Sequence, residues 1–179
     1  MIYVEKTRLI EDLQPYKDLW ETSNKVLYAQ FDNLFDTTRG TPKRPWDQIE
    51  CLENLRKETE IKVDRSLKHF DQYFLNYSRG SFTSLHKDTD KVQVTVITLI
   101  DISENLDGGD VLVMKPLSNR DIKGETRAKP SFLNPVKEEI VPEVWRLDLG
   151  ESLIYTGYVK HGVTRVKKGN RLVLVSWFK

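Results

Sequence analysis

From about residue 66 onward the chain reads as a series of short strands separated by glycine-containing turns, and this series most constrains its fold. Residues 92–100 (VQVTVITLI) are apolar on both faces, as expected for a strand that is covered on two sides. The turn signals DGGD, DLGE and KKGN separate further runs that are rich in β-branched and aromatic residues. The predicted strands span residues 71–77, 92–100, 111–114, 145–149, 153–155, 163–166 and 172–178. Such a series predicts a β-sandwich or jelly roll.

The first 65 residues have a helical character instead. Apolar residues recur with a period close to 3.6 across residues 11–35, which predicts one helix. The stretch 37–45 (TTRGTPKRP) interrupts this pattern, and a second helix is expected at residues 46–59. We therefore expect a single domain over residues 1–179, mainly β with N-terminal helices (α+β). Its helical part would support a β core formed by residues 66–179.

Composition limits which kinds of binding partner and which cellular compartment we expect for this chain. The chain has 28 Lys and Arg against 27 Asp and Glu, so no overall charge favours nucleic acid or an acidic membrane as a partner. The single cysteine, Cys51, cannot form an internal disulfide, which fits a reducing compartment. The segment MIYVEKTRLIEDL lacks the apolar run of a signal peptide, and no apolar run reaches membrane-spanning length. These features predict a cytoplasmic protein, and we expect a monomer or weak dimer.

Three residues have the spacing of a metal site. His86 and Asp88 form a His-x-Asp pair, and His161 follows at a distance, in a chain with only 3 histidines. This is the pattern of the 2-His-1-carboxylate facial triad, which holds Fe(II) and leaves adjacent coordination positions open. In an extended strand, residues i and i+2 point to the same face, so His86 and Asp88 would project into one space. The alternative is a surface turn, because a lone His-x-Asp often arises by chance.

Arg171 follows His161 by ten residues and could anchor an acidic cosubstrate. If KKG is a three-residue hairpin loop with Gly169 in the left-handed conformation, the two flanking strands pair and His161 lies opposite Val175. That register places His161 and Arg171 on the same face of the sheet. A loop of two or four residues would place them on opposite faces.

Residues 115–141 form a long segment with three prolines and no clear period. A loop of this length can be a mobile solvated connection or a cover over a substrate, and both interpretations remain open. We expect it to form part of the substrate wall together with residues 78–83 (SRGSFT).

Three stretches of the chain resemble the prolyl 4-hydroxylase-like branch of the Fe(II)/2-oxoglutarate oxygenases. They are NYSRGSFTSLHKD (residues 76–88), TVITLIDISENLDGGDVLV (residues 95–113) and HGVTRVKKGNRLVLVSWF (residues 161–178). The third is the most specific, because it joins an H-x-V-T start to a G-x-R and an aromatic strand end. The resemblance covers more than half of the chain and implies a double-stranded β-helix (jelly-roll, cupin-like) core.

The resemblance also implies roles for individual residues. Iron would be bound by His86, Asp88 and His161, and Arg171 would pair with the distal carboxylate of 2-oxoglutarate. Tyr77 matches a tyrosine that lines the cosubstrate pocket, and Thr95 matches a small hydroxyl residue on the neighbouring strand. The chain departs from several relatives at Leu99, where they have a tyrosine that helps to hold the distal carboxylate.

The activity that follows from the resemblance is Fe(II)- and 2-oxoglutarate-dependent hydroxylation of an amino-acid side chain. Dioxygen would be the oxidant, and the resemblance allows ascorbate as an accessory reductant. Prolyl residues in a peptide or protein are the leading expectation for the substrate. The alternatives are the same chemistry on a free amino acid or another small molecule, and a jelly-roll module that binds metal without turnover. Arg171 counts against the last alternative, because a pure metal binder needs no cosubstrate anchor.

Overall fold

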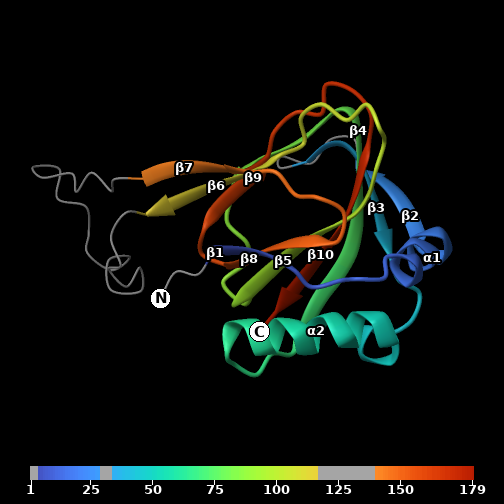
Figure 1. Ribbon diagram of the computed structural model, residues 1–179, viewed down its shortest axis with the longest axis vertical. Helices are drawn as coiled ribbons and strands as arrows, with labels where there is room; N and C mark the ends of the chain where they lie inside the picture. The colour runs from blue at the N-terminus through green and yellow to red at the C-terminus, as the bar shows by residue number, and fades with distance from the viewer. Residues whose placement is uncertain (1–3, 29–33, 117–139) are drawn as a thin grey trace, which may run out of the picture.

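The computed structural model describes residues 4–28, 34–116 and 140–179, and within them it shows a curled antiparallel sheet flanked by helices (Figure 1). The elements are β1 (Val4–Arg8), α1 (Gln14–Thr22), β2 (Asn24–Tyr28), β3 (Leu34–Thr41), η1 (Trp46–Gln48), α2 (Glu50–Val63), β4 (His69–His86), β5 (Val94–Ile102), β6 (Val111–Pro116), β7 (Ile140–Trp145), β8 (Glu151–Thr156), β9 (Lys160–Val163) and β10 (Arg171–Phe178). The strand order is β1-β8-β5-β10-β4-β9-β6-β7, and β3 joins β2 to the free edge of β4. The expected jelly-roll core is confirmed.

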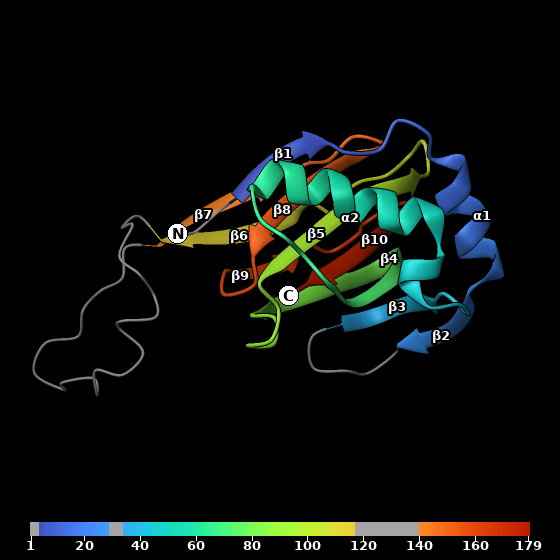
Figure 2. The ribbon, with the colours of Figure 1, turned by 90° about the horizontal axis from the view of Figure 1, so that it is seen from below.

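The sheet buries two different faces because its strands alternate. In β10, Val173 and Val175 belong to the cluster inside the curl, whereas Leu172 and Leu174 belong to the cluster on the opposite side. The opposite side is covered by the helices, and Figure 2 shows α2 lying across β5, β10 and β4. This two-sided burial explains why the strands read as nearly continuous apolar runs.

The long strand β4 connects the two halves of the curl. Its first part pairs with β10 from His69 to Tyr77, and its end pairs with β9, where His86 lies opposite His161. β9 in turn pairs with β6, so residues distant in the sequence meet at the end of β4. This geometry positions the candidate site described below.

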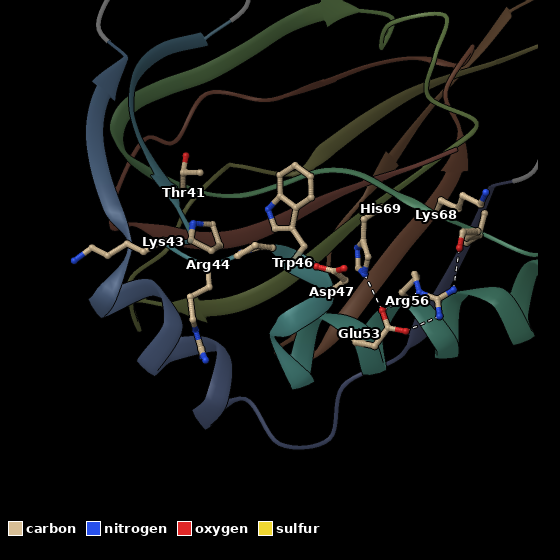
Figure 3. Close-up of a pocket in the computed structure, with 12 residues that line it drawn as sticks. Thr41, Lys43, Arg44, Trp46, Asp47, Glu53, Arg56, Lys68 and His69 are labelled. Atoms are coloured by element: carbon tan, nitrogen blue, oxygen red, sulfur yellow. Dashed lines mark hydrogen bonds and ion pairs between the residues drawn. The ribbon is translucent and has the colours of Figure 1, made fainter.

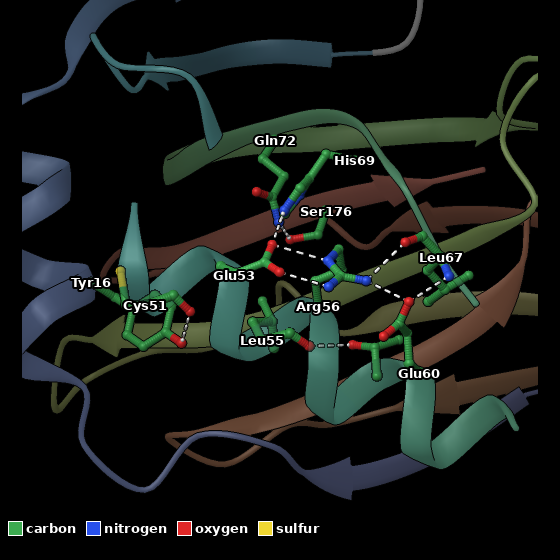
Figure 4. Close-up of polar contacts among 11 residues, drawn as sticks. Tyr16, Cys51, Glu53, Leu55, Arg56, Glu60, Leu67, His69, Gln72 and Ser176 are labelled. Carbon is green, nitrogen blue, oxygen red and sulfur yellow. Dashed lines mark hydrogen bonds and ion pairs between the residues drawn. The ribbon is translucent and has the colours of Figure 1, made fainter. Parts of the chain in front are cut away.

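A polar network holds α2 against the start of β4 (Figure 4). Arg56 donates to both carboxylate oxygens of Glu53, at 3.0 and 2.6 Å, and to the carbonyl of Leu67 at 2.9 Å. The side chain of Glu60 pairs with Arg56 and accepts from the Leu67 amide at 2.7 Å. Nε2 of His69 lies 2.9 Å from Glu53. The hydrogen bonds from Arg56, followed by that from His69, lower the pKa of Glu53 from 4.5 to about 2.

The single helix predicted for residues 11–35 is wrong. The helix ends at Thr22, and Asn24–Tyr28 form β2, which pairs with β3. Trp20 packs so closely over Gly40 of β3 that a Cβ at Gly40 would overlap its ring. Tertiary strand pairing therefore overrides the local period. The second helix is confirmed as η1 followed by α2, and in the described ranges no helix is both long and apolar enough to cross a membrane.

Several strand boundaries also differ from those expected. The strand predicted at 145–149 instead ends at Trp145, and the one predicted at 163–166 instead spans Lys160–Val163. The strand predicted at 71–77 is longer at both ends, and β4 (His69–His86) includes residues 78–83. The expected long segment 115–141 is bordered by β6 and β7, and its residues 117–139 lie outside the described part of the chain.

Candidate functional site

The structure brings His86, Asp88 and His161 together inside the curl. His86 ends β4, Asp88 follows that strand, and His161 lies directly opposite His86 in β9. Their ligand atoms all lie within 4.8 Å of one another. Oδ1 of Asp88 is 3.9 Å from Nε2 of His86 and 3.6 Å from Nε2 of His161. Within the described ranges this is the single group of His, Cys, Asp and Glu side chains close enough to hold a metal ion.

Backbone carbonyls orient both imidazole rings. Nδ1 of His86 lies 2.8 Å from the carbonyl oxygen of Ser84, and Nδ1 of His161 lies 3.0 Å from that of Val159. A carbonyl only accepts hydrogen bonds, so each Nδ1 carries a proton, and Nε2 is the ring nitrogen left to ligate a metal. Such an outer hydrogen bond fixes the tautomer of a ligating histidine. Both rings are therefore set to bind a metal through Nε2.

The carboxylate of Asp88 is oriented in the same way. The hydroxyl of Thr95, which is buried on β5, donates to Oδ2 of Asp88. Oδ1 faces the two histidines and is buried without a hydrogen-bond partner among the described atoms. A buried carboxylate oxygen without a partner is costly unless a ligand satisfies it. Two imidazole nitrogens and one carboxylate oxygen are a donor set that suits Fe(II) with open positions, so the residues fit the expected metal.

Burial keeps His161 suited to this role. Loss of water around the ring lowers its pKa, Asp88 acts in the opposite direction, and His86 lowers the pKa again. The net lowering favours the neutral imidazole, which is the form that ligates a metal.

Arg171 is a buried cation whose polar atoms lack partners. It is 4% exposed, and its Nε and Nη2 have no hydrogen-bond partner among the described atoms. Its guanidinium carbon lies 5.3 Å from the ring centre of Tyr77, directly across the β10–β4 pair. Burial lowers the pKa of Arg171, while Tyr77 and Asp110 oppose this. A buried guanidinium with free donors is suited to bind a carboxylate.

The hairpin expected between His161 and Arg171 does not form. His161 pairs with His86 and Val113, whereas Val175 pairs with Tyr73 and Ile97. The two strands belong to different parts of the curl, so the connection after β9 crosses between them instead of reversing. Gly169 nevertheless has the expected positive φ of 71°. His161 and Arg171 still share one interior, because Val163 and Val173, on the same faces of their strands, both belong to the inner cluster.

The remaining residues named from the sequence lie in the same interior. Tyr77 is 2% exposed, and its hydroxyl lies 2.7 Å from that of Thr83. Leu99 and Arg171 line a cavity of about 160 Å³ at the end of the barrel. Gly109 allows Arg171 to pass, because a Cβ there would lie 2.7 Å from Cδ of Arg171. The hydroxyl of Thr95, a residue predicted to bind the cosubstrate, donates a hydrogen bond to Asp88.

Two functional features were missed in the sequence, the hydroxyl partner Thr83 and the buried phenol of Tyr155. Tyr155 is 0% exposed, and its ring centre is 4.6 Å from that of His161. It pairs with Thr95 across the β5–β8 strands. No local signal marks it, because it looks like any apolar position of a buried strand.

A larger hollow, of about 760 Å³, lies on the helix side of the sheet (Figure 3). Trp46, Glu53, Arg56 and His69 contribute to its lining, and no triad residue does. The carboxylate of Glu53 is already paired, since Arg56 and His69 both contact it. The barrel interior is therefore the better candidate site, because polar atoms without partners mark it more strongly than volume does.

Comparison with known proteins identifies the fold. No family model and no curated protein sequence matches the chain significantly. An oxidoreductase of the 2OG-Fe(II) oxygenase family from Burkholderia pseudomallei superposes with a TM-score of 0.65 at 14% identity, over 93% of this chain and 78% of that one. A prolyl-4-hydroxylase from Pseudomonas putida superposes with a TM-score of 0.62 at 18% identity, over 98% of this chain and 91% of that one. The α-ketoglutarate-dependent epimerase SnoN of nogalamycin biosynthesis superposes with a TM-score of 0.64 at 12% identity, over 98% of this chain and 75% of that one. The chain therefore has the jelly-roll fold of the 2OG-Fe(II) oxygenases.

Proposed function

We propose that this protein is an Fe(II)- and 2-oxoglutarate-dependent dioxygenase that hydroxylates an amino-acid side chain. The observation that carries the proposal is the presence, in one buried interior, of a His-Asp-His cluster and an arginine with two nitrogens that have no hydrogen-bond partner among the described atoms. The cluster suits an iron with open positions, and the arginine suits the far carboxylate of a dicarboxylic acid. The shared fold supports the same assignment.

Each residue then has a definite task. His86, Asp88 and His161 hold the iron, and the Thr95 hydroxyl keeps Asp88 turned toward it. Arg171 binds the distal carboxylate and so orients the cosubstrate, in a site where low dielectric strengthens the pair. When bound, iron and 2-oxoglutarate supply the oxidising chemistry with dioxygen. The protein contributes position and the exclusion of water.

We infer that the substrate is a prolyl residue in a peptide or protein. The likeness to the Pseudomonas putida prolyl-4-hydroxylase and the sequence resemblance support this class. Tyr73 and Trp177 meet edge to face at 5.5 Å, and Trp177 lies across the strands from Thr95. An aromatic surface on the strand next to Thr95, which holds Asp88, suits a pyrrolidine ring.

The second candidate is the same chemistry on a free amino acid or another small molecule. It is favoured by one observation, the likeness to the epimerase SnoN of nogalamycin biosynthesis at a similar TM-score. A metal-binding module without turnover is disfavoured, because it would leave the buried charge of Arg171 uncompensated.

The test is an anaerobically loaded Fe(II) enzyme that is given 2-oxoglutarate, dioxygen and a panel of proline-containing peptides, with and without ascorbate. Mass spectrometry should show the gain of one oxygen atom on a peptide, with stoichiometric formation of succinate. A matched peptide with alanine in place of proline is the control. Succinate without any oxidised peptide, together with oxidation of a free amino acid, would support the small-molecule alternative. Absence of both 2-oxoglutarate binding and succinate formation would contradict the proposed function.

A further inference from the structure

Tyr155 carries a buried hydroxyl that the fold does not satisfy. The side chain is 0% exposed, and its hydroxyl has no hydrogen-bond partner among the described atoms. A buried hydroxyl that makes no hydrogen bond destabilises the folded protein. Phenylalanine would fill the same space without this cost, so the hydroxyl needs a reason.

The position of Tyr155 indicates where its partner would be. Its ring packs on His161, with ring centres 4.6 Å apart. On the adjacent strand it lies opposite Thr95, the residue that orients Asp88. The hydroxyl therefore lies beside the His-Asp-His cluster, on the inner face of the barrel that also carries Arg171.

The phenol can act only as a neutral hydrogen-bonding group. A tyrosine hydroxyl ordinarily loses its proton only at about pH 10, so the phenol keeps its proton at neutral pH. Thr95 lies opposite Tyr155 on the adjacent strand, and the Tyr155 hydroxyl makes no hydrogen bond to any described atom. Thr95 already donates its proton to Asp88. The Tyr155 proton is thus available to a ligand.

We propose that the Tyr155 hydroxyl binds the cosubstrate, donating a hydrogen bond to an oxygen atom at the metal-chelating end of the 2-oxo acid. This inference rests on the proposed function and divides the cosubstrate between two groups of the chain. Arg171 holds one end as a charged pair, and Tyr155 holds the other as a neutral donor. Both groups have polar atoms without hydrogen-bond partners in the part of the chain that the structure describes, and both gain partners from the same molecule.

The test is Tyr155→Phe, which keeps the ring and its contact with His161. Three quantities are measured: the Kd for Mn(II), the Kd for 2-oxoglutarate at saturating Mn(II), and the charge-transfer band of the anaerobic Fe(II)–2-oxoglutarate complex. We expect an unchanged metal Kd, 2-oxoglutarate binding weakened by about tenfold or more, and a band moved to shorter wavelength. The band should move because the lost hydrogen bond no longer stabilises the acceptor orbital of the chelating oxygens.

Thermal unfolding without ligands separates binding from structure. Because the hydroxyl has no partner in the free protein, Tyr155→Phe should keep or raise the Tm. The matched control is Tyr16→Phe, which removes a buried phenol hydroxyl that donates to the Cys51 carbonyl at 2.8 Å. It should lower the Tm and leave the 2-oxoglutarate Kd unchanged.

The inference is overturned if Tyr155→Phe binds 2-oxoglutarate as tightly as the unaltered protein. It is also overturned if the variant loses metal affinity instead, because Tyr155 would then act through Thr95 and Asp88. If the unaltered protein itself does not bind 2-oxoglutarate, the proposed function fails as well. Failure of the inference alone and failure of the proposed function are thus distinguishable.

Discussion

The barrel interior and the polar network of Glu53, Arg56 and His69 between α2 and β4, called the α2 layer below, use the same kinds of side chain in opposite ways. In the α2 layer, Glu53 is paired with Arg56 and with His69, and only Nδ1 of His69 lacks a partner among the described atoms of these three side chains. In the barrel, Oδ1 of Asp88 and two nitrogens of Arg171 are buried without partners. Both regions contain a histidine, a carboxylate and an arginine.

The difference shows how a stabilising network can be told from a binding site. The paired side chains of Glu53 and Arg56 hold α2 to the start of β4. Because they already bind each other, they are less available to bind a ligand in the hollow. Charges that are buried but not neutralised destabilise the free protein, so their presence indicates a ligand that completes them. The larger hollow therefore lies at the α2 layer, which is the weaker candidate for a binding site, and the smaller cavity is the one lined by Arg171.

The strongest test of this comparison is to replace one histidine in each region by alanine. His86→Ala should lower affinity for Fe(II) or Mn(II) by more than the roughly 10- to 100-fold that loss of an outer hydrogen-bond partner costs, and should abolish turnover. The control, His69→Ala, should retain metal binding. Calorimetric titration with Mn(II) measures both. Equal metal affinity in the two variants would remove the distinction between the regions.

The second test compares the arginines. Arg171→Ala should raise the Kd for 2-oxoglutarate by about 30-fold or more, because a charge-assisted pair in a buried site is lost, while the metal Kd stays unchanged. Arg56→Ala should leave the 2-oxoglutarate Kd unchanged and lower the Tm. Parallel loss of metal and cosubstrate affinity in Arg171→Ala would point to misfolding rather than to lost recognition.

A third prediction concerns Thr95 and sharpens the account of Asp88. Thr95→Val should weaken metal binding by about tenfold or more, because Asp88 loses the donor that turns it toward the histidines. Thr98→Val is the matched control on the same strand, since the Thr98 hydroxyl contacts Ser152 at 2.7 Å and not Asp88. If both variants bind Mn(II) equally well, the role of Thr95 lies elsewhere.

The smallest expected effect is a pH-dependent stability in the α2 layer. Because Arg56 and His69 lower the pKa of Glu53 from 4.5 to about 2, its ionised form stabilises the folded state above pH 4.5, and this stability is lost as the pH falls toward 2. Glu53→Gln should cost about 1–2 kcal/mol at neutral pH, since the side chain is partly exposed, and should flatten the dependence below pH 4.5. Chemical denaturation from pH 7 to 2.5 measures this. An unchanged acid limb in the variant would contradict the assignment.

Prediction from the sequence succeeded where the information was local or matched a known pattern. Apolar patterning predicted the strand at 92–100 and the second helix, and both are present with boundaries shifted by a few residues. Turn chemistry predicted the positive φ of Gly169, which is observed. The triad spacing predicted three residues that the structure brings together. The helix over 11–35 and the hairpin after His161 were wrong, because both depended on which strands pair across the whole chain.

The sequence by itself determined the donor set of the site: two histidines, one aspartate and one arginine at spacings that suit a metal and a dicarboxylic acid. Only the tertiary structure decided that β4 would be long enough to pair with both β10 and β9. That pairing places His161 beside His86, while the pairing of β8 with β5 sets Tyr155 opposite Thr95. Among the described residues, two nitrogens of Arg171 are left buried without a hydrogen-bond partner. The physical reason is that alternation sets which side of a strand is apolar, whereas the meeting of two strands depends on contacts between segments distant in the sequence.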